Sequence, residues 1–530
     1  MSSGLDAISV VLSVGVMSVS AAAGPAGPAR EAPAHRPPAG AAVEVAADVE
    51  NPGFEGDGGW TGLVAGNAEY YAPVEGGRYA VLGRPGALLT QRTGTVVQPG
   101  MRYEVTVWAR SIYDDAHTAR LASPTYADLP VVGTSAIASA RLSLGAAGDP
   151  IASTELDVSP RALLGDAATT GNDDGANVWV DGEFRVQFSD SILIQRISDD
   201  PITDPWRRLV DEDYDQDLAV GVVVIPGGRK LVLDCFYTDD PPVGEAWESL
   251  ITLRSVRGSP PSYDWGPRRV VLFNERRNTG DPDDQLPWVI DAHAFWDADT
   301  ERLWMSWGGH DLYVSELDPA TGRPIDGAGN VVESDLGGLD PDVTDDPVHT
   351  MVVRERPEAA LADPWRRSTY QEGPAIHEHG GYFYYFATYG NLAFDYTIRV
   401  GRSTDPRGPY LDREGESLLD GNGTILLGDD TEQLVPGHPH VWEESGASYL
   451  GYDYRTTRDQ AEGEMDFMGI RRLHWVDGWP TIWRPVTVSF LSDDHPDAIG
   501  RRLEISIGNA GDPGSVLAVD RVTVGKAAAR

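Results

Sequence analysis

Acidic side chains recur at regular points in the middle of this 530-residue chain. Five successive strand-rich units occupy this region. The first four begin with Asp174, Asp217, Asp291 and Glu372, and the fifth begins with His438. Carboxylates at close range raise one another's pKa, so that one is held protonated while another stays ionised. Such a pair can protonate a leaving group and activate water, which is the chemistry of acid/base hydrolysis.

The units that carry these residues repeat with a long period over residues 169–484. Each has an entry strand, a turn, an aromatic-rich second strand and a third strand, as in Asp291-Ala-His-Ala-Phe-Trp followed by Arg302-Leu-Trp-Met-Ser-Trp. Five such units closing into a ring predict a five-bladed β-propeller, whose first strands line the axis and begin at its mouth. An irregular β-sandwich is the alternative that the same local pattern allows.

Strand-like segments on both sides of the repeats predict a second domain. Apolar and polar residues alternate in Tyr103-Glu-Val-Thr-Val-Trp, Leu503-Glu-Ile-Ser-Ile and Leu517-Ala-Val-Asp-Arg-Val, a pattern typical of half-buried strands. We therefore predict an all-β chain in which a β-sandwich over residues 46–168, completed by 485–526, is interrupted by the propeller. Two separate β elements flanking the propeller are the alternative.

The first residues are typical of a secreted protein. Residues 7–23 are apolar and end in small side chains, so we predict a signal peptide over 1–23, although Asp6 stands where a positive charge is usual. Residues 24–45, rich in Ala, Pro and Gly, predict a disordered linker. No later apolar run reaches membrane-spanning length. We expect an extracellular protein.

The overall charge limits the partners. A net charge of −40 argues against binding to nucleic acid or to an anionic membrane, and we expect a monomer. The single cysteine, Cys235, excludes an intramolecular disulfide and a cysteine-based zinc site. It lies in an apolar run and is expected to be a buried thiol.

Several motifs, taken in order, resemble glycoside hydrolase family 43 and in particular its arabinanase-like branch. They are Val289-Ile-Asp-Ala-His-Ala-Phe, Glu372-Gly-Pro, Tyr396-Thr-Ile-Arg-Val-Gly-Arg-Ser, Gly423-Thr-Ile-Leu-Leu, Pro436-Gly-His and Trp475-Val-Asp-Gly-Trp-Pro. The sandwich segments are similar to the carbohydrate-binding modules that such enzymes commonly carry. The resemblance implies a propeller that hydrolyses O-glycosyl bonds of a polysaccharide or oligosaccharide.

The resemblance also implies roles for three carboxylates. Glu372 matches the general acid, and Asp291 matches the carboxylate that orients this acid and tunes its pKa. Asp174 is the predicted general base, with Asp173 and Asp217 as alternatives. The prolines that usually follow the base and the pKa-tuning carboxylate are replaced here by glycine and alanine.

Further residues are assigned to substrate and metal by the same resemblance. Asp217, His293, Tyr389 and Arg399 are the predicted substrate-binding residues. His438 matches a histidine that lies beside a metal ion, often Ca²⁺, on the propeller axis of arabinanases. A hydrogen-bonding structural histidine is the alternative reading of His438.

Members of this family invert the anomeric centre. Their acid and base stand about 6.5–9.5 Å apart, which leaves room for the attacking water. The resemblance therefore implies hydrolysis of arabinofuranosyl linkages by an arabinanase or arabinofuranosidase. The alternatives are a β-xylosidase or an exo-hydrolase of another polysaccharide, and a non-catalytic glycan-binding propeller, which the missing prolines favour.

Overall fold

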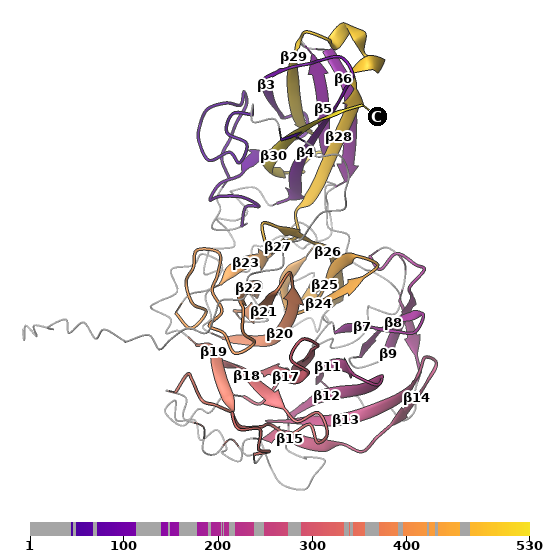
Figure 1. Ribbon diagram of the computed structural model, residues 1–530, viewed down its shortest axis with the longest axis vertical. Coiled ribbons are helices and arrows are strands. Elements are labelled where there is room, and N and C mark those ends of the chain that lie inside the picture. The colour runs from indigo at the N-terminus through magenta and orange to yellow at the C-terminus, as the bar shows by residue number, and fades with distance from the viewer. Residues whose placement is uncertain are drawn as a thin grey trace, which may run out of the picture.

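The chain is built almost wholly of antiparallel strands, as the computed structural model in Figure 1 shows. The all-β class predicted from the sequence is confirmed. The structure describes residues 44–45, 49–66, 72–112, 139–146, 149–157, 177–188, 192–202, 204, 206–210, 218–237, 249–273, 288–332, 336, 339, 343–355, 370–390, 396–420, 423–429, 433–455 and 467–529. Among these residues no helix is long and apolar enough to cross a membrane.

Five consecutive sheets form the lower body in Figure 1. Blade 1 contains β7 (Val178–Asp181), β8 (Phe184–Phe188), β9 (Ile192–Arg196) and β10 (Arg207–Leu209). Blade 2 contains β11 (Leu218–Ile225), β12 (Arg229–Tyr237), β13 (Ser249–Ser259), β14 (Ser262–Trp265) and β15 (Arg269–Phe273). Blade 3 contains β16 (His293–Asp297), β17 (Arg302–Trp307), β18 (Leu312–Leu317) and β19 (His349–Val353). Blade 4 contains β20 (Gln371–His379), β21 (Tyr382–Tyr389), β22 (Thr397–Ser403) and β23 (Thr424–Leu427), and blade 5 contains β24 (Leu434–Glu444), β25 (Ala447–Arg455), β26 (Phe467–Val476) and β27 (Trp479–Thr481).

The first strands of the blades surround a common axis. β11 contacts β16, β16 contacts β20, β20 contacts β24, and β24 contacts β7. β11 and the residues just before β16 approach closely at a glycine: a Cβ on Gly221 of β11 would lie 2.3 Å from the carbonyl oxygen of Ala292. The chain therefore closes into the propeller ring, and the starts of β16, β20 and β24 meet at one end of the axis.

Blades 1 and 5 close the ring without sharing a strand among the described residues. Arg185 of β8 forms a buried ion pair with Glu444 of β24 at 2.6 Å, with side chains 2% and 10% exposed. The same guanidinium donates to the Gln195 side chain and to two backbone carbonyls. Removing either partner of a buried ion pair leaves an unpaired buried charge, which is strongly destabilising. These contacts therefore hold blade 1 against blade 5.

Two further sheets face each other above the propeller in Figure 1. The first contains β1 (Glu44–Val45), β2 (Ala80–Leu82), β4 (Met101–Ser111), β28 (Arg484–Leu491) and β30 (Leu517–Ala528). The second contains β3 (Leu88–Val96), β5 (Ser139–Ala146), β6 (Asp149–Asp157) and β29 (Arg502–Asn509). In both sheets strands that precede the propeller pair with strands that follow it: β4 with β28 and β30, and β29 with β3 and β5.

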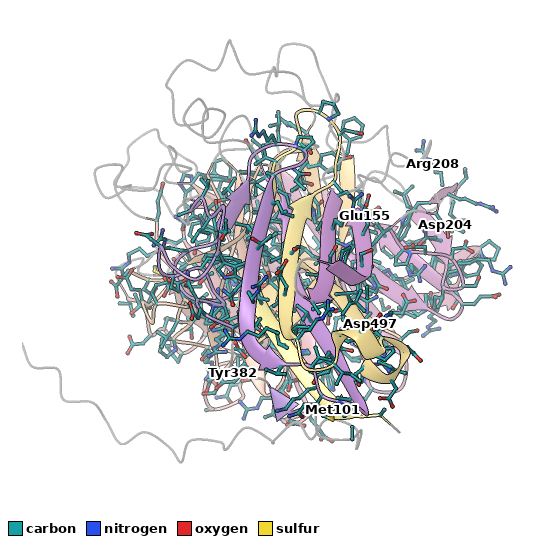
Figure 2. The ribbon with its side chains drawn as sticks, turned by 90° about the horizontal axis from the view of Figure 1, so that it is seen from above. Met101, Glu155, Asp204, Arg208, Tyr382 and Asp497 are labelled. Atoms are coloured by element: carbon teal, nitrogen blue, oxygen red, sulfur yellow. The ribbon has the colours of Figure 1, made fainter. Side chains whose placement is uncertain are left out.

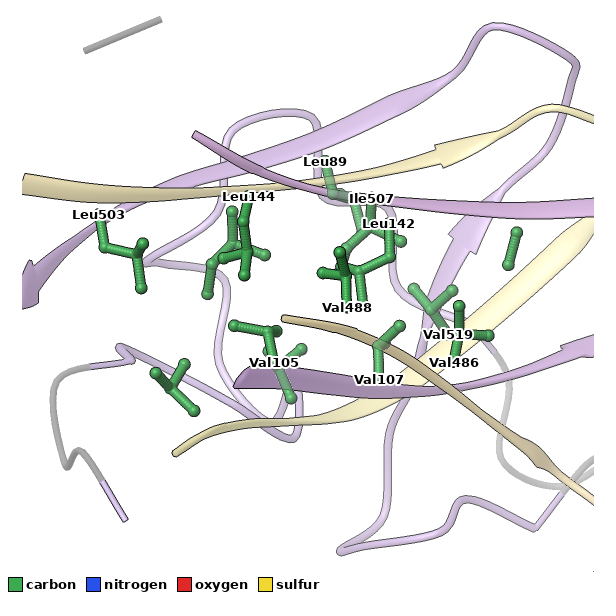
Figure 3. Packing of buried hydrophobic residues seen from close by; sticks show 14 of the residues in the cluster. Leu89, Val105, Val107, Leu142, Leu144, Val486, Val488, Leu503, Ile507 and Val519 are labelled. Atoms are coloured by element: carbon green, nitrogen blue, oxygen red, sulfur yellow. The ribbon is translucent and has the colours of Figure 1, made fainter. Parts of the chain in front are cut away.

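The core between these sheets follows from the alternating pattern of their strands. In β3 and β29 every second side chain is buried, so one face of each sheet is apolar. Figure 3 shows Leu89, Leu142 and Ile507 facing Val105, Val107 and Val488 across the gap. Burying one such aliphatic side chain contributes about 1.5–3 kcal/mol.

The sandwich is held against the outer part of blades 4 and 5. Arg413 donates to the carbonyls of Pro73 and Val74, and the Trp483 indole donates to the carbonyl of Ala72 at 3.0 Å. Seen from above, the sandwich strands lie in front of the propeller, and blade 1 with Arg208 extends to one side (Figure 2). In blade 2, Cys235 is buried, as expected.

Candidate active site

Three of the predicted site residues converge at the end of the axis where blades 3, 4 and 5 begin. Asp291 precedes β16 by two residues, Glu372 is the second residue of β20, and His438 lies in β24. Their candidate ligand atoms all lie within 4.8 Å of one another. Radial repetition of the blades brings these residues together although up to 147 positions separate them in the sequence.

Asp291 is the residue that joins the three strands. Its backbone adopts a left-handed φ of 56°, an uncommon conformation for a non-glycine residue that concentrates at functional sites. Its Oδ2 accepts hydrogen bonds from the backbone N–H of Gly373 at 2.9 Å and from Nε2 of His438 at 3.0 Å. The carboxylate therefore fixes the backbone directly after Glu372.

The glycine of Glu372-Gly-Pro is required by its surroundings. Gly373 has a φ of 58°, and a Cβ at this position would lie 2.3 Å from Cδ2 of His438. A side chain would thus meet both a backbone penalty and a clash. The close contact allows the imidazole to pack against the strand that carries Glu372.

His438 lies between two carboxylates. Nε2 faces Asp291, and Nδ1 lies 3.5 Å from Oδ2 of Asp453. Burial alone would lower the pKa of His438, but the charges and hydrogen bonds of Asp291 and Asp453 raise it well above its ordinary value. The residue is fixed further by the hydrogen bond from its backbone N–H to the Thr388 hydroxyl at 2.9 Å.

Glu372 has a partner that the sequence analysis missed. The hydroxyl of Tyr370 donates to Oε2 of Glu372 at 2.6 Å. The Tyr370 ring also contacts His310 and Trp288, with centroid distances of 4.8 and 5.9 Å. Residues two apart on a strand share a face, and this spacing was the available signal for Tyr370.

Deeper on the axis lies a pair of neutral histidines. Nε2 of His440 donates to the carbonyl of Val178 at 2.8 Å. Its Nδ1 must therefore accept from Nε2 of His293, at 3.1 Å. Burial and the mutual repulsion of nearby histidines lower the pKa of His293 well below its usual value, and burial lowers the pKa of His440 to about 4. This pair connects blades 3, 5 and 1.

A small cavity of about 20 Å³ separates the carboxylate cluster from this histidine pair. Its lining includes Asn177, Asp291, His293 and His438. The volume is enough for one water molecule. Nδ1 of His293 faces the backbone N–H of Ile376 at 3.4 Å, so the predicted substrate-binding residue His293 contributes to the floor beneath the cluster.

The other predicted residues are placed differently. Tyr389 and Arg399 belong to the interior of blade 4, where they are 1% and 2% exposed and the guanidinium lies 5.5 Å from the tyrosine ring. They support the blade from within and do not form an open surface. The predicted base Asp174, its alternative Asp173, and Asp217 lie outside the described residues.

The fold and the site define a class of protein: a β-propeller with carboxylates at its mouth, arranged for acid/base chemistry on a polar substrate. Residues 279–480 match the family model described as "Glycosyl hydrolases family 43". This segment contains Asp291, Glu372 and His438. The propeller of this chain is therefore similar to glycoside hydrolase family 43 over these residues.

Characterised relatives are similar over part of the chain. The extracellular endo-alpha-(1->5)-L-arabinanase 2 of Bacillus subtilis is 30% identical over 227 residues, which are 37% of this chain and 41% of that protein. The extracellular exo-alpha-(1->5)-L-arabinofuranosidase ArbA of Cellvibrio japonicus is 25% identical over 248 residues, 45% of this chain and 62% of that protein. The chain thus covers less than two thirds of each. A solved alpha-L-arabinanase of Cellvibrio cellulosa, complexed with arabinohexaose, aligns with a TM-score of 0.43 and 20% identity, over 59% of this chain and 96% of that one.

Proposed function

We propose that this protein is an inverting glycoside hydrolase that cleaves arabinofuranosyl linkages of arabinan. The observation that carries the proposal is the contact of Asp291 with both Gly373 and His438, because it fixes the direction of Glu372 at the mouth. The family match and the arabinan-cleaving relatives support the choice of substrate.

In this mechanism Glu372 is the general acid. It gives its carboxyl proton to the departing glycosidic oxygen as the anomeric C–O bond breaks. A carboxylate as close as Asp291 favours the protonated form of Glu372. After one turnover Glu372 is an anion that the Tyr370 hydroxyl stabilises, since a hydrogen bond to a charged acceptor is stronger than one to a neutral acceptor.

We assign the general base to Asp174. It would take one proton from a water molecule, whose oxygen forms the new bond to the anomeric carbon on the face opposite the leaving group. The products are then a sugar of inverted configuration and a free hydroxyl on the departing chain. This assignment rests on the sequence resemblance, with Asp173 and Asp217 as the alternatives.

No step of this mechanism is routed through the calcium ion that the resemblance places beside His438. Ca²⁺ takes about six to eight oxygen ligands, whereas the cavity beside His438 has room for one water molecule. Nε2 and Nδ1 of His438 lie 3.0 and 3.5 Å from carboxylate oxygens of Asp291 and Asp453. The space beside His438 is therefore smaller than a Ca²⁺ ion with its full set of ligands requires.

The first test compares arabinan with an activated aryl arabinofuranoside. Glu372→Gln should lower the rate on linear arabinan by about 10²–10⁴-fold, the usual contribution of general acid catalysis. It should lower the rate on the aryl substrate much less, because a good leaving group needs little protonation. Asp174→Asn should impair both reactions. Glu378→Gln, an exposed glutamate on the same strand, is the matched control.

Product analysis completes the test. Proton NMR should show the β-anomer of arabinofuranose-ended products first, and the product lengths distinguish endo from exo action. Full activity of Glu372→Gln on arabinan would refute the assignment. Hydrolysis of xylobiose in place of arabinan would favour the β-xylosidase alternative. Binding of arabinan by the wild-type protein without hydrolysis would favour the non-catalytic alternative.

We also propose that the protein acts outside the cell. Both named relatives are described as extracellular, and the sequence predicts a signal peptide over residues 1–23, which lie outside the described residues. Mass spectrometry of the secreted protein would test this by showing whether the mature chain begins after residue 23.

A further inference from the structure

A second cluster of histidine and glutamate lies at the far end of the strands that carry the site. His377 and His379 are two residues apart in β20, so both side chains point to the same side, toward blade 5. Glu443 lies on β24 of that blade. Candidate ligand atoms of these three residues all lie within 4.8 Å of one another.

The distances within this cluster are close to those of a metal site. Oε1 of Glu443 lies 2.8 Å from Nδ1 of His379 and 3.6 Å from Nε2 of His377. Ligand atoms around a tetrahedral ion with bonds of about 2.0–2.1 Å are separated by roughly 3.3 Å. The two observed distances bracket this value, so movements of about half an ångström would admit an ion.

One ring nitrogen in the cluster is left unsatisfied. Nε2 of His377 is buried and has no hydrogen-bond partner. A buried polar atom without a partner costs free energy, and a metal ion would satisfy it. The side chains of His377, His379 and Glu443 are 15%, 28% and 47% exposed. The cluster is thus open to solvent on one side, which gives an ion an entry path and leaves a position for water.

The neighbouring groups hold the ligands in place. The ring of Trp475 stacks on His379 with a centroid distance of 3.8 Å and an interplanar angle of 6°, and it lies nearly parallel to His377. The indole N–H of Trp475 donates to the Ser448 hydroxyl at 2.8 Å, and that hydroxyl donates to Oε1 of Glu443 at 3.3 Å. Such outer contacts orient metal ligands and lower the entropic cost of binding.

The charge of Glu443 is suited to a cation. The approach of His377 and the hydrogen bond from His379 lower the pKa of Glu443 to about 2. Its carboxylate is therefore ionised throughout the physiological pH range. On binding, Nδ1 of His379 would exchange its hydrogen bond to Glu443 for a bond to the ion.

We propose that His377, His379 and Glu443 bind a divalent transition-metal ion such as Zn²⁺, with water in the fourth position, and that the ion cross-links blades 4 and 5. Two imidazoles and one carboxylate favour Zn²⁺, Ni²⁺ or Cu²⁺ over Mg²⁺ and Ca²⁺. The two histidines lie five and seven residues along β20 from Glu372, about 16–23 Å of extended strand, so the site is separate from the mouth cluster.

Titration of the full chain with ZnCl2 after dialysis against a chelator tests the proposal. Calorimetry should show one equivalent of Zn²⁺ bound at this site, and Co²⁺ should give the visible spectrum of a tetrahedral ion. His377→Ala/His379→Ala should remove this equivalent, and Glu443→Gln should weaken it at least about tenfold. His495→Ala, a histidine of the sandwich, is the matched control and should bind as the wild-type protein does.

Thermal unfolding provides a readout that does not depend on enzyme activity. Zn²⁺ should raise the Tm of the wild-type protein and of His495→Ala, because an ion that binds only the folded state stabilises it. It should leave the Tm of the double variant unchanged. Unchanged Zn²⁺ stoichiometry and affinity in the folded double variant, or in Glu443→Gln, would overturn the proposal. So would a wild-type protein that binds Ca²⁺ here as tightly as Zn²⁺.

Discussion

Strands β20 and β24 carry histidine and carboxylate side chains at both of their ends, and the two ends are built differently. At the mouth, Asp291 and His438 adopt left-handed backbone conformations and are buried. At the far end, His379 and Glu443 lie in regular strand backbone and are partly exposed. Left-handed backbone at non-glycine residues persists only where the surrounding contacts enforce it.

This difference separates two kinds of site. The mouth cluster is buried, with His438, Asp291 and Asp453 at most 7% exposed, and its geometry is fixed before any ligand arrives, as catalysis requires. The far cluster is partly exposed to solvent, so an external ligand can reach it. Histidine and carboxylate side chains can therefore form a catalytic group or a metal site, depending on how deeply they are buried and on the conformation of their backbone.

The largest effect on the contrast between the two ends is expected from two glycines that have similar backbone conformations. Gly373→Ala should lower activity on the order of 100-fold, because its Cβ would displace His438 and misalign Glu372. Gly380 has a φ of 60° but nothing within 4 Å of the added Cβ. Gly380→Ala should cost about 1 kcal/mol of stability and leave activity intact. Rate and Tm measurements on both variants test this, and equal losses of activity would contradict it.

A smaller effect is expected from the partner of Glu372. Tyr370→Phe should lower kcat about 10–100-fold with little change in KM, because a hydrogen bond to a charged group is worth about 1.5–3 kcal/mol. Steady-state kinetics on arabinan measures this change. Tyr382→Phe, at the far end of β21, is the control and should keep the wild-type kcat. If both variants have the wild-type kcat, the Tyr370 hydroxyl has no part in the reaction.

The histidine pair between the two ends should make the propeller sensitive to acid. The pKa of His440 is about 4 in the folded protein and about 6.5 in the unfolded chain. The unfolded chain therefore gains protons first, and stability that is present above pH 6.5 is lost as the pH falls toward 4. The contribution of one such group is on the order of 3 kcal/mol.

Thermal unfolding between pH 7 and pH 4 measures this loss. His440→Gln should show a shallower decrease of Tm with falling pH than the wild-type protein does. His495→Gln in the sandwich should follow the wild-type curve. Parallel curves for His440→Gln and the wild-type protein would show that the pair does not govern acid stability.

The smallest effect is expected at the far end in the presence of a chelator. Glu443→Gln should change the free energy of unfolding by less than about 1 kcal/mol, since partly exposed ion pairs contribute little. The next residue provides the contrast: Glu444→Gln should cost about 3 kcal/mol or more, because it leaves the buried charge of Arg185 without its partner. Chemical denaturation of both variants distinguishes the two environments. A large loss in Glu443→Gln without metal would mean that the cluster is purely structural.

Much of the fold was accessible from the sequence because its signals are local. The alternating strands and the aromatic repeat predicted an all-β chain, and the carboxylates at strand starts indicated which residues would meet at the mouth. Asp291, Glu372 and His438 meet there because every blade begins at the same end of the axis. Because the blades are arranged around one axis, residues at equivalent positions of successive repeats lie close together at the same end of that axis.

Other features depend on side-chain direction, which a repeat does not specify. Tyr389 and Arg399 were expected at the substrate, yet they lie inside blade 4. Tyr370 precedes its strand by one residue and was missed, although it contacts Glu372. The pairing of His377 and His379 with Glu443 depends on how blade 4 packs against blade 5, and 64 positions separate His379 from Glu443 in the sequence. No local pattern carries this information.

The order of strands in the sandwich has a consequence for synthesis on the ribosome. β3 and β4 emerge before any blade, but β28, β29 and β30, which pair with them, emerge only after blade 5. The apolar faces of the early strands therefore stay without their partners while the whole propeller is being translated. Because chains fold from the N-terminus as they emerge, the sandwich must be the last part to assemble. A nascent chain that is stopped within the propeller therefore exposes an apolar surface that chaperones can recognise.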